Sequence, residues 1–250
     1  MIEIISQIGK YLLFLGRAFA LPKKNSMFKK LLLREFYNLG YSSVGLVGFI
    51  SLFIGAVVSI HFYDSVATRN IPTPISLVGT STLSLMVLEL SPTLISLILT
   101  GKIGAYIASS IGTMKVTEQI DALDVMGINS VSFLVLPKII ASLIFNPLLI
   151  ALSVLCGSLG GYLMGEISGN WTQEDYVVGM RAAFEPFKFL YCYLKTVAFA
   201  FMMVTVPSFF GYHTKGSSID VGKSSNLSVV WTSISIIVLN LLITQLMFGK

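Results

Sequence analysis

Long stretches of apolar residues, separated by short polar segments, dominate this chain. Between Glu35 and Asp64, for example, the sequence contains no charged residue. An α-helix of about 20 apolar residues crosses the roughly 30 Å of hydrocarbon in a bilayer, at about 1.5 Å per residue. The pattern therefore predicts five membrane-spanning helices, at about residues 41–63, 80–105, 139–164, 189–211 and 227–248.

The second of these apolar stretches is unusual. It extends from Ile75 to Ile111, which is too long for one simple span, and it contains Glu89, Pro92 and Lys102. Proline removes a backbone donor and clashes with the preceding turn of a helix. We therefore expect a kinked span that continues as a helix beyond the membrane.

Residues 2–20 have a different pattern. Glu3, Gln7, Lys10 and Arg17 lie near one stripe of a helix. Apolar residues such as Ile8 cover much of the remaining surface. This pattern predicts an amphipathic helix that lies in the membrane interface. A short true span is the alternative, and it would require burial of Lys10 and Arg17.

The segment GTMKVTEQIDALDVMG, residues 112–127, is polar although both of its neighbours are apolar. Four charged residues fall within ten positions, at Lys115, Glu118, Asp121 and Asp124. An apolar stripe repeats at helical spacing, at Val116, Ile120 and Leu123. A short amphipathic helix of this kind can dock in a groove of a soluble partner. An ordinary solvated loop fits the pattern equally well, so both interpretations remain open at this point.

The composition decides the class of protein. Of the 250 residues, 54% are hydrophobic and only 12% are charged. Soluble domains have about 25% charged residues. This chain therefore has too few polar groups to cover its surface in water, and the sequence predicts an all-α membrane protein with an N-terminal interfacial helix and five transmembrane helices.

The charge distribution predicts how the chain is oriented in the membrane. Its formal net charge is +5, and the basic residues cluster near the N-terminus, at Arg17, Lys23, Lys24, Lys29, Lys30 and Arg34. Such a cluster beside a span is typical of the cytoplasmic side and of attraction to anionic lipid, rather than of nucleic-acid binding. We therefore expect a cytoplasmic N-terminus, residues 112–127 also in the cytoplasm, and the C-terminus on the opposite side.

Two kinds of residue inside the apolar stretches are candidates for function or packing. Glu89 and Lys195 are single charges in apolar surroundings, which are costly unless they face a cavity or a partner. A structural pair and a substrate-contacting role both fit them. Small residues repeat at four-residue spacing, at Gly104, Ala108 and Gly112, and again at Gly157, Gly161 and Gly165. Such faces allow close helix packing, either within one chain or across a homodimer seam.

Catalytic and metal-binding patterns are not apparent in the sequence. The stretch SIDVGKSS ends like a phosphate-binding loop, but position 217 is serine where that motif begins with glycine. No serine–histidine–aspartate arrangement and no cluster of metal ligands is visible. We therefore predict no catalytic residue, no metal site and no enzymatic activity. Cys156 and Cys192 are interpreted as small core residues.

At residues 101–128, the sequence GKIGAYIASSIGTMKVTEQIDALDVMGI closely resembles the signature of the MlaE/YrbE permeases, the membrane subunits of MCE-associated lipid ABC transporters. Three shorter elements resemble the same family: LELSPTL (88–94), YLKTVAF (193–199) and LNLLITQLMFG (239–249). The resemblance covers the chain from about residue 30 onward. It implies that residues 1–250 form a single permease domain.

The resemblance also implies partners and cargo. Two copies of the permease would form the membrane core, and each would bind a cytoplasmic ABC ATPase through a coupling helix at about residues 115–125. The coupling residues would be Lys115, Glu118, Gln119, Asp121 and Leu123. ATP and Mg²⁺ would bind to that ATPase, and this chain would hold no cofactor. A protein with MCE domains would exchange phospholipid, or a related hydrophobic lipid, between the bacterial inner membrane and the cell envelope.

The chain departs from the family pattern at several polar positions. Leu88 replaces an arginine, Ser91 replaces a glycine, and Asn240 stands where many members have an acid in the fifth span. The resemblance implies that Glu89, Lys195 and Asn240 form the polar part of a lipid cavity. The uncharged Asn240 favours either a simple ion pair between Glu89 and Lys195 or a changed lipid preference. An ion-coupled secondary carrier that uses Glu89 and Lys195 is the alternative function, although we see no inverted repeat. A structural membrane scaffold is a third.

Overall fold

The computed structural model describes residues 2–20, 25–68 and 74–249, and every regular element in these ranges is a helix. Five of the described helical segments are long and apolar enough to cross a membrane: Phe28–Ala67, Leu77–Val116, Ser130–Ser168, Pro186–Tyr212 and Ser218–Phe248. Even the shortest of them, at 27 residues, is about 40 Å long. The predicted all-α fold with five candidate spans is therefore confirmed.

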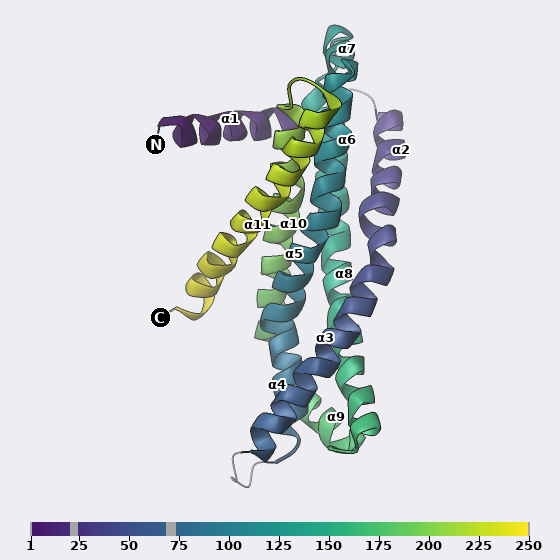
Figure 1. Ribbon diagram of the computed structural model, residues 1–250, viewed down its shortest axis with the longest axis vertical. Helices are drawn as coiled ribbons and strands as arrows, with labels where there is room; N and C mark the ends of the chain where they lie inside the picture. The colour runs from purple at the N-terminus through teal and green to yellow at the C-terminus, as the bar shows by residue number, and fades with distance from the viewer. Residues whose placement is uncertain (1, 21–24, 69–73, 250) are drawn as a thin grey trace. The chain divides into compact units, whose positions relative to one another are not determined.

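The first two spans are built from several consecutive helical elements (Figure 1). The first consists of α2 (Asn25–Glu35), the π-helical turn η1 (Phe36–Tyr41) and α3 (Ser42–Ala67). The second consists of α4 (Leu77–Leu85), the π-helical η2 (Met86–Leu94), α5 (Ile95–Leu99), the π-helical η3 (Thr100–Gly104) and α6 (Ala105–Val116). Pro92 lies inside η2, so the expected irregularity of the second span takes the form of π-helical turns.

The remaining spans are continuous helices: α8 (Ser130–Ser168), α10 (Pro186–Tyr212) and α11 (Ser218–Phe248). All five helices are longer than the predicted spans. The prediction followed the apolar residues alone, whereas each helix continues beyond them into polar residues. The largest difference is at the first span, where helical structure begins well before residue 41. Glu35, which marked the expected boundary, is buried within this helix and paired with Lys138.

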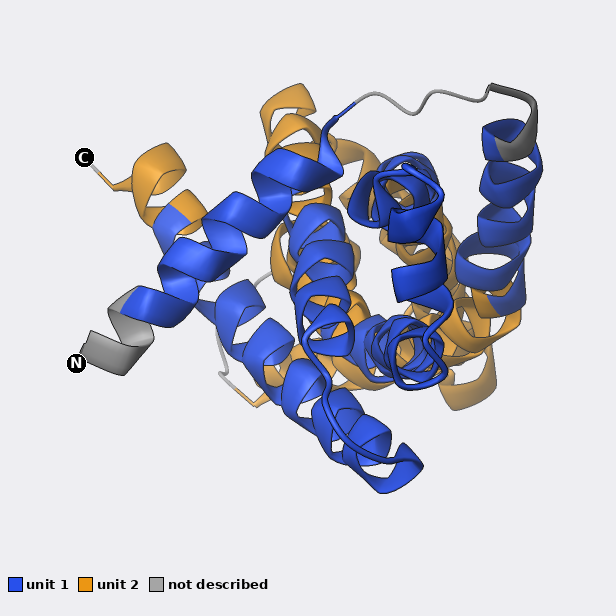
Figure 2. Cartoon of the chain, turned by 90° about the horizontal axis from the view of Figure 1, so that it is seen from above, with its two compact units in different colours: residues 1–42, 97–145, 198–242 blue, residues 43–96, 146–197, 243–250 orange. Residues whose placement is uncertain are grey.

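Three shorter helices complete the described structure: α1 (Ile2–Ala18), α7 (Gln119–Val125) and α9 (Gln173–Ala182). The chain divides into two compact units, coloured in Figure 2. Unit 1 comprises residues 1–42, 97–145 and 198–242, and unit 2 comprises residues 43–96, 146–197 and 243–250. Helices α8, α10 and α11 contribute to both units.

Unit 2 is held together where α3 crosses α8 at very short range. A Cβ on Gly55 would meet the Gly157 carbonyl oxygen, and a Cβ on Gly160 would meet the Leu52 carbonyl oxygen. Buried serines follow the same crossing: Ser51 donates to Ser153 at 2.8 Å, and Ser153 donates to Ser91 of η2 at 2.9 Å. Small residues therefore bring the backbones together, and hydroxyl groups then bond between helices.

The glycines predicted on the third span have neighbours within unit 2. A Cβ on Gly157 would meet the Met86 side chain, one on Gly161 would meet Ser59 and Tyr176, and one on Gly165 would meet Trp171. In unit 1, Gly104 faces Pro207, Gly112 faces Val221, and Ala108 is fully buried beside Gly211. Both small-residue faces thus pack within this chain.

The N-terminal helix α1 belongs to unit 1 and lies across α10 in Figure 1. Phe14 is buried and packs edge-on against Phe209, while the Tyr11 hydroxyl is 2.7 Å from that of Thr205. Leu12, on the other side of the helix, is exposed. Lys23 and Lys24 of the basic cluster lie outside the described residues.

Candidate functional site

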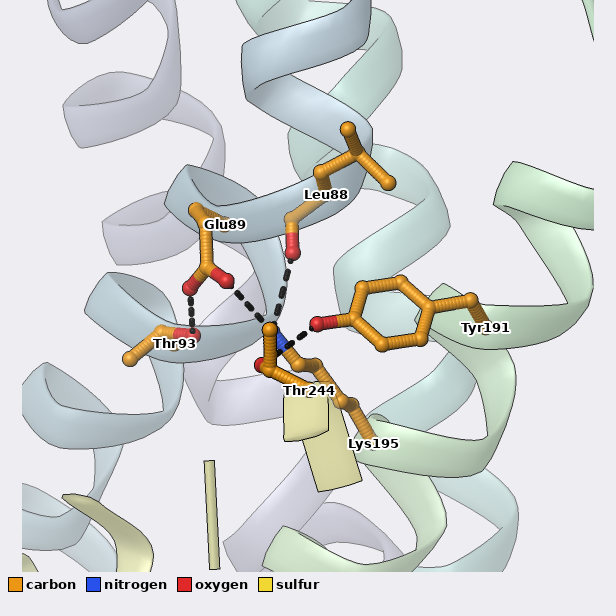
Figure 3. Close-up of polar contacts among 6 residues, drawn as sticks. All are labelled: Leu88, Glu89, Thr93, Tyr191, Lys195 and Thr244. Carbon is orange, nitrogen blue, oxygen red and sulfur yellow. Dashed lines mark hydrogen bonds and ion pairs between the residues drawn. The ribbon is translucent and has the colours of Figure 1, made fainter. Parts of the chain in front are cut away.

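The two charges predicted inside the spans meet in unit 2. Lys195 Nζ of α10 lies 2.6 Å from Glu89 Oε1 of η2 (Figure 3). The Lys195 side chain is 0% exposed, whereas the Glu89 side chain is 40% exposed. Glu89 therefore compensates a fully buried ammonium group, although its own side chain is partly exposed. The structure therefore shows the pairing of the two residues, and contact with a ligand stays a prediction.

Pro92 explains how the backbone contributes to this ion pair. In an α-helix the Leu88 carbonyl would accept the N–H of residue 92, which proline lacks. The Leu88 carbonyl instead accepts a hydrogen bond of 3.2 Å from Lys195 Nζ. The ammonium group also lies 4.4 Å from the centre of the Tyr191 ring, at a distance typical of a cation–π interaction. The irregular η2 segment therefore helps to hold the ammonium group of Lys195 in place.

Three residues of this polar cluster were not predicted from the sequence. Thr93 donates to Glu89 Oε2 at 3.1 Å, and the Tyr191 hydroxyl lies 2.7 Å from Thr244 Oγ1 (Figure 3). Thr93 follows Glu89 by four residues, and this helical spacing could have predicted their contact. Tyr191 and Thr244 are separated by 53 residues, and no local pattern relates them.

Asn240, the third expected member of the cluster, is half-buried on α11 in unit 1. The residue that α11 places beside Tyr191 in unit 2 is Thr244, one helical turn later. In unit 2, hydrogen bonds, an ion pair and a cation–ring contact join Glu89, Thr93, Tyr191, Lys195 and Thr244. The place of Asn240 in this cluster stays a prediction.

A second buried ion pair was missed because its two residues lie at the edges of apolar stretches. Lys138 Nζ of α8 is 2.5 Å from Glu35 Oε1 of α2, and both side chains are less than 10% exposed. Lys138 also lies 5.3 Å from the centre of the Tyr106 ring, and Asn38 donates to the Tyr106 hydroxyl at 2.8 Å. This cluster joins α2, η1, α6 and α8 within unit 1.

The predicted coupling segment forms a turn and a short helix in unit 1. Helix α6 ends at Val116, and α7 begins only at Gln119, so the expected helix over residues 115–125 is wrong at its start. The reason is Glu118, whose φ of 60° is left-handed and breaks the helix between the two elements. Lys115 therefore belongs to α6, and its ammonium group bonds to Asp121 of α7 at 2.6 Å.

The side chains of α7 divide into an anchored group and an exposed group. Ile120 is fully buried, and Leu123 is half-buried, as the apolar stripe predicted. Glu118 and Gln119 are exposed. Val125 is 89% exposed and Met126 is 65% exposed, although both are apolar. The end of α7 is thus an exposed apolar tip, formed by Val125 and Met126, which was not predicted from the sequence.

Comparisons with known proteins agree with this architecture. A family model described as "Permease MlaE" matches residues 32–246. A probable ABC transporter permease protein of Rickettsia bellii is 31% identical over 247 residues, which cover 99% of this chain and 94% of the relative. The Haemophilus influenzae protein named intermembrane phospholipid transport system permease protein MlaE is 28% identical over 224 residues, covering 88% and 83%.

A more distant relative is the chloroplastic protein TRIGALACTOSYLDIACYLGLYCEROL 1 of Arabidopsis thaliana, which is 24% identical over 216 residues, covering 86% of this chain and 61% of the relative. The described helices and these similarities indicate a multi-pass membrane protein of the ABC transporter permease class. Because the family model spans most of the chain, and the rickettsial permease is similar along nearly its whole length, the chain belongs to the MlaE permease family.

Proposed function

We propose that this chain is the permease subunit of an ABC transporter that moves phospholipid, or a related hydrophobic lipid, between the inner membrane and the cell envelope. Membership of the MlaE family and the similarity to the Haemophilus protein, which is named for intermembrane phospholipid transport, support this cargo. The observation that carries the proposal is the exposed apolar tip of α7, formed by Val125 and Met126, next to the acidic residues Asp121 and Asp124. Such a tip suits a groove on a soluble protein.

A separate ABC ATPase would dock on α7 and bind ATP and Mg²⁺, and this chain would contribute no catalytic group. Force applied to the tip would reach the membrane helices by short routes. Lys115 joins α7 to α6 through Asp121, and the backbone N–H of Ser130, at the start of α8, is 3.4 Å from Asp124 Oδ1. The second and third spans would therefore respond together when the ATPase closes.

The transport path would involve a second copy of this chain and a lipid-binding protein with MCE domains. The cavity between two permease copies would narrow when the ATPase closes and would expel the lipid. Glu89 would meet the lipid head group, because its carboxylate is partly exposed while Lys195 neutralises it from the buried side. On this proposal the N-terminus and α7 lie in the cytoplasm.

The docking assignment can be tested with variants that keep the charge of α7 unchanged. Val125→Ser combined with Met126→Ser should reduce the ATP hydrolysis that co-purifies with the tagged chain by about tenfold or more. This estimate rests on about 1.5–3 kcal/mol for each large apolar side chain that a partner buries. Both residues are exposed, so membrane insertion and yield should not change.

Val178→Ser is the matched control, because Val178 on α9 is similarly apolar and exposed. This variant should retain the co-purifying ATP hydrolysis. Equal ATPase recovery with the α7 variant and with the control would contradict the docking assignment. Lipid mass spectrometry of the purified complex would identify the cargo, and a complex without lipid would favour a scaffold. Transport that continues without ATP and stops when the proton gradient is collapsed would favour the ion-coupled carrier instead.

A further inference from the structure

A small pocket in unit 1 lies between the N-terminal helix and the ends of two spans. Its volume is about 170 Å³, and α1 contributes Lys10, Leu13, Phe14 and Arg17 to its walls. The other walls come from Val131 near the start of α8, and from Tyr212 and His213 at the end of α10. The pocket therefore combines two permanent cations and an imidazole with an apolar floor.

The helical geometry of α1 explains this combination. Lys10 and Arg17 are seven residues apart, so they lie on the same side of the helix and about 10.5 Å apart along its axis. Phe14, between them, is buried against α10. The two cations thus flank the face of α1 that packs on the protein, whereas Leu12 is exposed. An amphipathic helix that only rested on lipid would have no reason to place its cations beside a protein pocket.

The walls of the pocket are fixed by hydrogen bonds. Asn129 Nδ2 donates to the Arg17 carbonyl at 3.0 Å, which ties the end of α1 to the segment before α8. The Tyr212 hydroxyl is 3.2 Å from Ser130 Oγ. His213 Nδ1 is 2.9 Å from the Phe209 carbonyl oxygen, and because a carbonyl only accepts, Nδ1 carries the hydrogen and donates it, which fixes the orientation of the imidazole ring.

We propose that this pocket binds the phosphate of an anionic phospholipid head group. Its lining includes Lys10 and Arg17 and no acidic side chain, so it favours a phosphate that carries net negative charge over a zwitterionic head group. Within the described residues neither Lys10 nor Arg17 forms an ion pair. Leu13, beside them, is 73% exposed, and this apolar surface fits the acyl chains of the same lipid.

The source of the phosphate is therefore the membrane rather than the solvent. The site is separate from the Glu89–Lys195 cluster and does not rest on the proposed transport function. A resident lipid here would hold α1 against the ends of α8 and α10.

Native mass spectrometry of the full-length chain in detergent tests this proposal. The chain is titrated with phosphatidylglycerol and, in parallel, with phosphatidylcholine, and the ratio of the two affinities is measured. Wild type should prefer phosphatidylglycerol. Lys10→Gln combined with Arg17→Gln should reduce that preference about 30-fold, because each basic residue near anionic lipid contributes roughly a factor of five. Each single variant should reduce the preference for phosphatidylglycerol about fivefold.

The matched control is Lys29→Gln combined with Lys30→Gln, which removes two exposed cations of α2 that do not line the pocket. It should keep the wild-type preference. An equal loss in both double variants, or no loss in either, would overturn the proposal. Inorganic phosphate that displaces phosphatidylglycerol better than chloride at equal ionic strength would overturn the assignment to a lipid and identify a free-phosphate site.

Discussion

Lys195 and Lys138 are both buried ammonium groups, but their partners differ in exposure. Lys195 is paired with Glu89, whose side chain is 40% exposed, and it also donates to a backbone carbonyl and faces an aromatic ring. Lys138 is paired with Glu35, whose second oxygen has no hydrogen-bond partner among the described residues. The first pair is therefore suited to contact with a ligand, and the second is suited only to holding helices together.

The Glu35–Lys138 pair leads to a stability prediction. Glu35→Leu should lower the free energy of unfolding by about 3–5 kcal/mol, because it leaves an uncompensated charge in the core. Adding Lys138→Met should recover most of this loss, since the buried charge is then gone. Thermal unfolding of the detergent-solubilised chain measures both effects. A Glu35→Leu variant as stable as wild type would contradict this prediction, because it would show that the Lys138 ammonium group does not depend on Glu35.

The left-handed backbone of Glu118 leads to a second prediction. A side chain at positive φ costs roughly 1–2 kcal/mol, which glycine avoids. Glu118→Gly should therefore slow amide hydrogen exchange in residues 119–128. Gln119→Gly, one residue later and inside α7, should instead speed exchange, because glycine destabilises a helix by up to about 1 kcal/mol. Exchange that is faster in both variants would mean that the Glu118 side chain itself holds the turn.

At the scale of elements, the close crossing of α3 and α8 depends on residues without side chains at the point of contact. The buried positions of α3 repeat every four residues, at Ser43, Val47, Ser51, Gly55 and Ser59. This stripe was visible in the sequence, but the predicted packing faces were those of η3, α6 and α8. A stripe of small residues shows that a helix face packs closely, and it does not show against which helix.

The crossing predicts a sharp contrast between two glycines of the same helix. Gly55→Ala should destabilise the protein by about 1–3 kcal/mol, because the new methyl group would meet the Gly157 backbone, which cannot rotate away. Gly45→Ala should be neutral or slightly stabilising, since no atom lies within 4 Å of its Cβ position. Thermal unfolding compares the two variants, and an equal effect would argue against the close crossing.

At the scale of the whole molecule, the span count predicts which segments share a side of the membrane. One span, α8, separates α7 from α9, so the two should lie on opposite sides. In a Cys156→Ala, Cys192→Ala background, Val178→Cys should react with an impermeant maleimide from outside intact spheroplasts. Val125→Cys should react only in inverted vesicles. Labelling of both cysteines from the same side would contradict the five-span topology.

The spans, the charged segment between the second and third of them, and the family were accessible from the sequence alone. Hydropathy is a local property, so a run of apolar residues such as 41–63 identifies a membrane helix wherever it packs. The signature at residues 101–128 is also continuous. Glu89 and Lys195 could be selected as a pair because a lone charge in an apolar run is costly and their signs are opposite.

The tertiary structure alone decided the contacts between segments that are distant in the chain. Lys138 finds Glu35 across 103 residues, and Tyr191 finds Thr244 across 53. The pocket at Lys10 and Arg17 exists because α1 packs beside Val131 and His213. Local sequence sets which side chains a helix carries, but the face that becomes buried depends on which other helices it meets. The sequence therefore determined the spans and the family, and packing determined the partners of each charge.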